Sequence, residues 1–164
     1  MCKTKAVFSI TLKQKSVFLF ILFVFLSFQI FSQQGGFKWS SDGNSYYRIE
    51  NNNVMQYTLP ENIAKVLMSK EQLTPKNSTL PLDVSYFIFS NDEQKVLIFT
   101  NTKRVWRLNT KGDYWVLDIA KGSLTQLGTS LPESSLMFAK FSPDGKAVAY
   151  VSNNNIYVED LNTS

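Results

Sequence analysis

The chain has 164 residues and a formal charge of +4, with no histidine and one cysteine, Cys2. Without histidine it cannot supply a Ser-His-Asp or Cys-His catalytic centre or a histidine-ligated metal. One cysteine cannot form an intrachain disulfide or a cysteine-rich zinc site. Four of the 17 basic residues but none of the 13 acidic ones lie in residues 1–32, so the remainder is formally neutral. The sequence therefore predicts no cofactor, no metal and no nucleic-acid partner.

Residues 1–32 have the features of an export signal. Lys13 and Lys15 precede an apolar run over residues 17–31, and the small residue Ser32 follows it. This order is typical of a secretory signal peptide, and the run is shorter than the roughly 20 residues that a membrane-spanning helix needs. We expect residues 1–32 to form a signal helix that is removed, which predicts a periplasmic or secreted protein. The alternative is a membrane anchor formed by residues 17–31.

Residues 33–164 contain a threefold repeat. Three segments share an aromatic residue, a serine and, two positions after the serine, an aspartate. They are Trp39-Ser40-Ser41-Asp42-Gly43, Phe89-Ser90-Asn91-Asp92-Glu93 and Phe141-Ser142-Pro143-Asp144-Gly145. They start 50 and 52 residues apart, and an asparagine follows each start by 12 positions: Asn51, Asn101 and Asn153. A period near 50 with short strands and polar turns is typical of β-propeller blades.

Each repeat unit is predicted to be an antiparallel meander. The Ser-x-Asp segment favours a tight turn, because the carboxylate can accept hydrogen bonds from nearby backbone N–H groups. Alternating apolar stretches follow at residues 95–99 and 147–151. The asparagines tolerate left-handed backbone and suit hairpin tips. The predicted fold is all-β: an incomplete β-propeller of about two and a half blades after the signal helix.

Residues 63–68 are ambiguous between helix and strand. Ile63, Val66 and Leu67 have helical spacing. The repeat favours a strand, because residues 56–67 align without a gap with residues 116–127, which read as strand, turn and strand. We therefore predict a strand at residues 63–68.

The second unit is ten residues longer than the first. The extra residues fall in or near Arg104–Tyr114, where Asn109–Asp113 is predicted to form a polar turn. Repeat proteins often place binding loops in such insertions. A plain surface hairpin is an equally good interpretation of the spacing.

The third unit stops at Ser164, two strands after its opening turn. Propellers commonly have 4–8 blades, so we expect the chain to be the N-terminal piece of a longer protein and to be poorly soluble alone.

Two stretches resemble the N-terminal propeller of dipeptidyl peptidase IV-like serine peptidases, which belong to the prolyl oligopeptidase family. One runs from Phe138 through Phe141-Ser142-Pro143-Asp144-Gly145 to Val158. The other contains Val105-Trp106-Arg107, then Tyr114-Trp115-Val116-Leu117-Asp118. The resemblance covers about residues 38–161 and identifies residues 33–164 as the N-terminal part of such a propeller.

The resemblance implies a secreted serine exopeptidase that removes dipeptides from free N-termini, with proline or alanine preferred as the second residue. It places the catalytic triad in a C-terminal α/β-hydrolase domain, while the propeller walls and gates the active-site cavity. It further implies a peptide substrate and a possible homodimer of the complete protein. By motif, Arg107 is the residue that contacts a substrate carbonyl.

The residues themselves leave other interpretations open. Arg107 could instead be a strand residue paired with Asp113 or Asp118. A nucleophile elbow is absent, since Leu131 and Pro132 follow Gly128-Thr129-Ser130, so no catalytic residue is predicted in this chain. The alternative function is a non-enzymatic periplasmic β-propeller that binds a protein or a glycan, because fold alone does not determine function.

The signal-peptide interpretation predicts that the exported protein lacks residues 1–32. Intact-mass measurement of protein recovered from the periplasm or medium is expected to show this loss, because signal peptidases cut after small residues. Retention of the leader would instead favour an anchor at residues 17–31.

Overall fold

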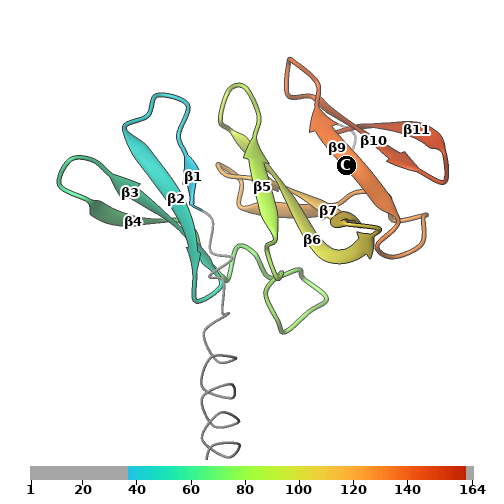
Figure 1. The fold of residues 1–164 in the computed structure, drawn as a ribbon, viewed down its shortest axis with the longest axis horizontal. Coiled ribbons are helices and arrows are strands. Elements are labelled where there is room, and N and C mark those ends of the chain that lie inside the picture. Colours follow the sequence, from blue (N-terminus) through green and yellow to red (C-terminus); the bar gives the residue numbers. More distant parts are fainter. Residues whose placement is uncertain (1–36, 162–164) are drawn as a thin grey trace, which may run out of the picture. The chain divides into compact units, whose positions relative to one another are not determined.

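The computed structural model describes residues 37–161, so the predicted signal segment lies outside the described residues. This range folds into eleven strands (Figure 1). In chain order they are β1 (Lys38–Trp39), β2 (Ser45–Glu50), β3 (Asn53–Thr58), β4 (Ile63–Met68), β5 (Tyr86–Phe89), β6 (Lys95–Val105), β7 (Leu108–Asp118), β8 (Ser123–Gln126), β9 (Leu136–Phe141), β10 (Ala147–Ser152) and β11 (Asn155–Asp160). Residues 37–161 include no apolar helix of the length that a membrane span requires.

The strands form three successive antiparallel meanders, here called blade one (β1–β4), blade two (β5–β8) and blade three (β9–β11). Within each blade, strands that follow one another in sequence are paired. A short pairing of β7 with β9 joins blades two and three into one seven-stranded sheet. The predicted all-β architecture of propeller blades is confirmed.

The ambiguous segment at residues 63–68 is strand β4, as the repeat predicted. It pairs with β3 as β8 pairs with β7, and the turn before each strand has a left-handed residue at the equivalent position. These residues are Asn62, with φ of 57°, and Gly122, with φ of 63°. Helical spacing of the apolar residues is overridden here by pairing with β3, because tertiary context outweighs local periodicity.

The three Ser-x-Asp turns (Ser40–Gly43, Ser90–Glu93 and Ser142–Gly145) have the same hydrogen bonds. In each, the serine hydroxyl donates to the aspartate at 2.6 Å. The same hydroxyl accepts the backbone N–H five residues later at 2.9–3.0 Å. The residue after each aspartate has φ between 55° and 73°. Glu93 therefore adopts the conformation that glycine provides in the other two turns.

The hydrogen bonds in these turns also stabilise the ionised carboxylates. The serine hydroxyl, followed by a backbone N–H, holds the pKa of Asp42, Asp92 and Asp144 below the usual range. Consecutive turns contact each other: the Ser41 hydroxyl donates to Glu93 at 3.4 Å, and Asn91 Nδ2 donates to the Pro143 carbonyl at 2.9 Å. They form the three loops at the top of Figure 1, which join β1 to β2, β5 to β6 and β9 to β10.

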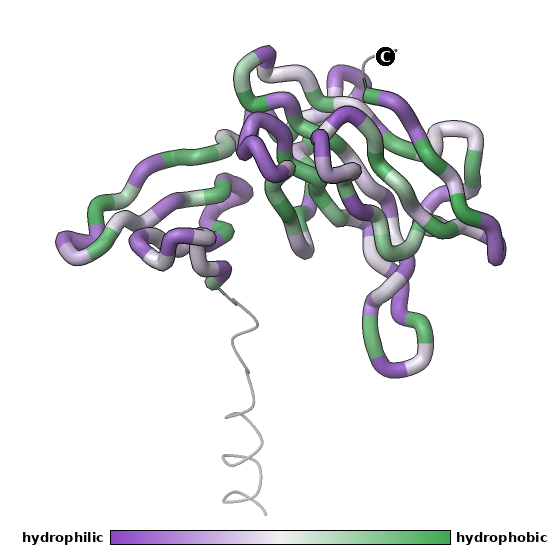
Figure 2. The backbone as a smooth tube through the Cα atoms, turned by 90° about the horizontal axis from the view of Figure 1, so that it is seen from above, coloured by the Kyte–Doolittle hydropathy of each residue, from purple (hydrophilic) through white to green (hydrophobic). Residues whose placement is uncertain are grey.

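Strand β6 supplies side chains to two separate cores. Successive side chains of a strand point to opposite faces. Val96 and Ile98 lie in a core shared with blade one, whereas Leu97 and Phe99 lie in a core shared with blade three. All four are less than 9% exposed, so blade two is buried on both faces. Figure 2 shows the hydrophobic stretches along the strands, with hydrophilic residues at several loop ends.

The outer face of blade one carries a cluster of aromatic rings. Phe37, Trp39 and Tyr46 contact one another edge to face, and Tyr57 stacks on Tyr46 with centroids 4.9 Å apart. Phe37 and Trp39 are more than half exposed. In blade two, the residues at the equivalent four positions all belong to the core shared with blade one. They are Phe87, Phe89, Val96 and Leu117.

The outer face of blade three shows the same relation. Ile156 is 78% exposed, whereas Val54 at the equivalent position of blade one is fully buried. Val158 is also largely exposed, while its counterpart Val116 is buried. One repeat position is thus buried where a neighbouring blade exists and exposed where the described residues provide none, which is the behaviour of a stacked repeat.

We expect Leu117→Ala to lower the free energy of unfolding by about 2–5 kcal/mol, because Leu117 is fully buried between blades one and two and its removal leaves a cavity. Urea denaturation of the chain measures this change. Leu80→Ala is the matched control, since Leu80 is 72% exposed and its truncation is expected to cost less than about 0.5 kcal/mol. Equal effects of the two variants would contradict this packing.

Candidate functional site

The most distinctive feature of the blades is the long hairpin formed by β6 and β7. In blade one, Glu50 pairs with Asn53 and only two residues form the tip. In blade two, the equivalent pair is Thr100 and Asp113, and residues 101–112 extend beyond it. The hairpin therefore contains the ten additional residues that the sequence predicted.

The tip of this hairpin is not where the sequence placed it. Residues 109–113 were expected to form a polar turn, but they lie within β7. The turn is formed by Trp106 and Arg107, between the paired residues Val105 and Leu108. Trp106 has φ of 60°, an uncommon conformation for a tryptophan. The predicted turn at residues 109–113 was wrong because β6 and β7 continue to pair beyond a bulge at Asn101. The pairs extend to Val105 and Leu108, so residues 109–113 are held in a strand.

The topology places this tip at the opposite end of the blade from the Ser-x-Asp turns. Connections in an antiparallel meander alternate between the two ends of the sheet. The Ser-x-Asp turn joins β5 to β6, so the following β6–β7 connection lies at the other end. We refer to residues 101–112 as the arm.

Arg107 lies at the tip of the arm, and no carboxylate among the described residues pairs with it. Its guanidinium lies 5.1 Å from the ring centroid of Trp106, which is itself 87% exposed. Within residues 37–161, no acidic side chain is within ion-pair distance of Arg107. A guanidinium held over an aromatic ring keeps its N–H donors available for an oxygen acceptor.

The alternative interpretation, in which Arg107 pairs with Asp113 or Asp118, is contradicted. Asp113 accepts hydrogen bonds from Asn101 Nδ2 at 2.7 Å and from the Ser134 backbone N–H at 2.6 Å. Asp118 accepts the backbone N–H of Lys121 and forms an ion pair with the same lysine at 3.6 Å. Both carboxylates are therefore engaged with partners other than Arg107, which lies at the tip of the arm.

The arm as a whole is cationic. Residues 101–112 include Lys103, Arg104, Arg107 and Lys111 and no acidic residue. Lys103 lies directly opposite Lys111 in the strand register, a pairing of like charges that destabilises a sheet. In the described range, neither lysine has an ion-pair partner. The arm thus combines an unfavourable pairing of like charges with an exposed tryptophan, which makes it the first candidate for a contact surface among the described residues.

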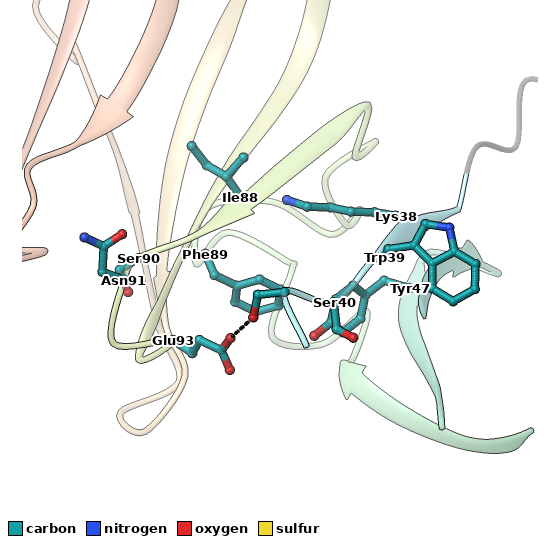
Figure 3. A pocket seen from close by; sticks show the side chains of 10 residues that line it. Lys38, Trp39, Ser40, Tyr47, Ile88, Phe89, Ser90, Asn91 and Glu93 are labelled. Atoms are coloured by element: carbon teal, nitrogen blue, oxygen red, sulfur yellow. Dashed lines mark hydrogen bonds between the residues drawn. The ribbon is translucent and has the colours of Figure 1, made fainter. Parts of the chain in front are cut away.

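A second candidate is a cavity of about 430 Å³ between β1 and β5, close to two of the Ser-x-Asp turns (Figure 3). Figure 3 shows the Lys38 side chain extending toward β5. Its ammonium donates to the Phe87 carbonyl at 2.7 Å and lies 5.1 Å from the Phe87 ring. Burial lowers the pKa of Lys38. Since this nitrogen is already engaged, Lys38 mainly ties blade one to blade two.

Sequence reasoning missed Lys38 altogether. Its partner is 49 residues away, and a lysine beside a tryptophan gives no signal of a cross-blade hydrogen bond. The described residues contain no group of three or more histidine, cysteine, aspartate or glutamate side chains placed to hold a metal ion.

Comparison with known proteins points to one family. Residues 90–164 match the family described as the dipeptidyl peptidase IV (DPP IV) N-terminal region. The probable dipeptidyl-aminopeptidase B of Tuber melanosporum is 36% identical over 72 residues, which cover 44% of this chain and 8% of the fungal protein. The protein of the same description from Aspergillus niger is 28% identical over 121 residues, 74% of this chain and 13% of its own.

A solved structure shares the fold. The crystal structure of Porphyromonas gingivalis dipeptidyl peptidase 4 superposes with a TM-score of 0.69 at 21% identity, covering 85% of this chain and 20% of that one. The chain thus spans between 8% and 13% of the length of the two curated relatives.

The close approach of the two strands at the base of the arm gives a test of its geometry. A Cβ added at Gly112 would lie 2.6 Å from the Thr100 carbonyl oxygen and would also overlap the Phe99 ring. Gly112→Ala is therefore expected to force the strands apart and to lower the free energy of unfolding by about 1–3 kcal/mol. Urea denaturation measures it; stability equal to the unchanged chain would show that the strands do not approach so closely.

Proposed function

Because this chain carries a dipeptidyl peptidase IV-like N-terminal region, we propose that it forms the substrate-positioning wall of a secreted serine exopeptidase that releases dipeptides from peptide N-termini. The proposal assigns gating and binding to this region. Peptide hydrolysis requires a base, and the chain has no histidine. The nucleophile and its base would come from an α/β-hydrolase domain outside these residues.

One observation carries the proposal: Arg107 lies at the tip of the ten-residue extension, with its guanidinium over Trp106 and no carboxylate of residues 37–161 paired with it. Such a side chain can donate hydrogen bonds to the carbonyl oxygen of a bound peptide. A guanidinium suits this role since it remains charged at every relevant pH and holds its donors in a fixed plane. A bound peptide would lie across the tip of the arm.

The arm would also limit access to the active-site cavity. Trp106 and Leu108 are largely exposed in the described chain, and a hydrolase domain facing the tip would cover them. Apolar contact at that point would exclude water around the peptide and thereby strengthen the hydrogen bond from Arg107.

The remaining parts of the proposal concern location and assembly. Residues 1–32 would direct export to the periplasm or medium, and the complete peptidase could form a homodimer. The alternative, a non-enzymatic periplasmic propeller that binds a protein or glycan, is not favoured, because the matching relatives are dipeptidyl peptidases.

The test is the activity of the complete protein, hydrolase domain included, on a dipeptide-amide substrate. Arg107→Ala is expected to lower kcat/KM roughly 10- to 100-fold, since a hydrogen bond from a charged donor contributes about 1.5–3 kcal/mol. The kcat/KM of Arg107→Lys should lie between those of Arg107→Ala and the unchanged protein, because lysine keeps the charge but loses the planar set of donors.

Arg48→Ala is the matched control. Arg48 forms an exposed ion pair with Glu50 at 3.4 Å and belongs to blade one, not to the arm, so its removal should leave kcat/KM within about twofold. Unchanged kcat/KM in Arg107→Ala would remove Arg107 from the substrate site. No dipeptide release by the complete, folded protein would refute the peptidase assignment itself.

A further inference from the structure

The base of the arm is closed by a buried carboxylate. Asp113 is 8% exposed, and its two oxygens accept hydrogen bonds from different segments. Oδ2 accepts Asn101 Nδ2 at 2.7 Å, and Oδ1 accepts the backbone N–H of Ser134 at 2.6 Å. The Ser134 hydroxyl in turn donates to the Asn101 carbonyl at 2.8 Å. Three residues far apart in sequence thus form a closed ring of hydrogen bonds.

Two of these residues have backbones that need support. Asn101 has φ of 46° and Ser134 has φ of 53°, both in the left-handed region. Such conformations persist where surrounding interactions hold them. Asn51 and Asn153, at the equivalent positions, have left-handed backbones as parts of two-residue hairpin tips. In blade two the hydrogen bond that Asn101 Nδ2 donates to the Asp113 carboxylate lets Asn101 form a bulge from which the arm continues.

The ring also fixes the arm to the next blade. Ser134 precedes β9, and the arm residues Lys111 and Gly112 pair with Met137 and Leu136 of that strand. The direction in which the arm leaves blade two is therefore set by contacts with blade three as well as by its own sheet. In blade one, Asn51 and Asn52 end the hairpin at this level.

We propose that Asp113 is a positioning residue for substrate binding: it orients the arm so that Arg107 meets the peptide. This inference rests on the proposed function. A carboxylate suits this position because each of its oxygens accepts one hydrogen bond, one from the Asn101 side chain and one from the Ser134 backbone. An alanine at this position would offer neither acceptor, whereas an asparagine could keep both bonds if the side-chain amide of Asn101 turned over.

The test uses the complete peptidase with Asp113→Ala, alone and combined with Arg107→Ala. Loss of the carboxylate is expected to raise KM for a dipeptide-amide roughly 5- to 50-fold with kcat within about twofold, because substrate and transition state lose the same contact. In the Arg107→Ala background the same change should have almost no further effect, since both variants remove one interaction. Additive losses would overturn the proposal and leave Asp113 with a purely structural role.

Asp144→Ala is the matched control, because Asp144 also accepts serine and backbone hydrogen bonds but lies in the Ser-x-Asp turn of blade three, at the other end of the sheet. It should leave KM unchanged whatever it does to stability. Asn101→Gly provides a milder variant that permits the left-handed backbone and loses the Nδ2 bond; a rise in KM of the same kind is expected.

Hydrogen exchange separates this inference from the proposed function. In the chain itself, Asp113→Ala is expected to speed amide exchange in residues 102–110 at least tenfold, while amides of β10 exchange as before. Slow exchange in the arm of the folded variant would overturn the positioning role even if the peptidase is active. Exchange in the arm of the variant could instead be fast while the complete protein releases no dipeptides. That result would refute the proposed function and the role of Asp113 in substrate binding. It would still show that the hydrogen bonds of Asp113 hold the arm in place.

Discussion

Burial of both faces of blade two is the constraint on which the other features depend. Alternate side chains of β6 enter two different cores, so the sheet is held from both sides and its strands can resume pairing beyond the bulge at Asn101. An arm of residues 101–112 on an unsupported sheet would be a marginal hairpin in water. Packed between two neighbours, the same hairpin becomes a fixed support for Arg107.

Much of the fold could be predicted because the three copies of the repeat can be compared with one another. Three copies of the aromatic-Ser-x-Asp segment predicted three equivalent turns, and comparison of copies decided between helix and strand at residues 63–68. The comparison also gave the length of the insertion, because the difference in length between two repeat units can be read from the sequence alone. A single unit would have left each of these points open.

The sequence could not predict where the arm turns or what holds it. The position of the tip depends on whether Asn101 forms a turn or a bulge, and that depends on Asp113 and on Ser134, which lies 33 residues away. Glu93 was a visible departure from glycine, yet its turn keeps the same serine–aspartate hydrogen bond as the other two. Contacts between blades, such as that of Lys38 with Phe87, leave no local signal.

The Ser-x-Asp turns bear on the order in which the chain acquires its structure. Each turn closes a loop of only five residues with its own side chains, so the entropy lost in forming it is small. The faces between blades join residues some 50 positions apart and are entropically far more demanding. The Ser-x-Asp turns would therefore form early and transiently in a growing polypeptide. Each would then help to align a new meander against the preceding one as the chain leaves the ribosome.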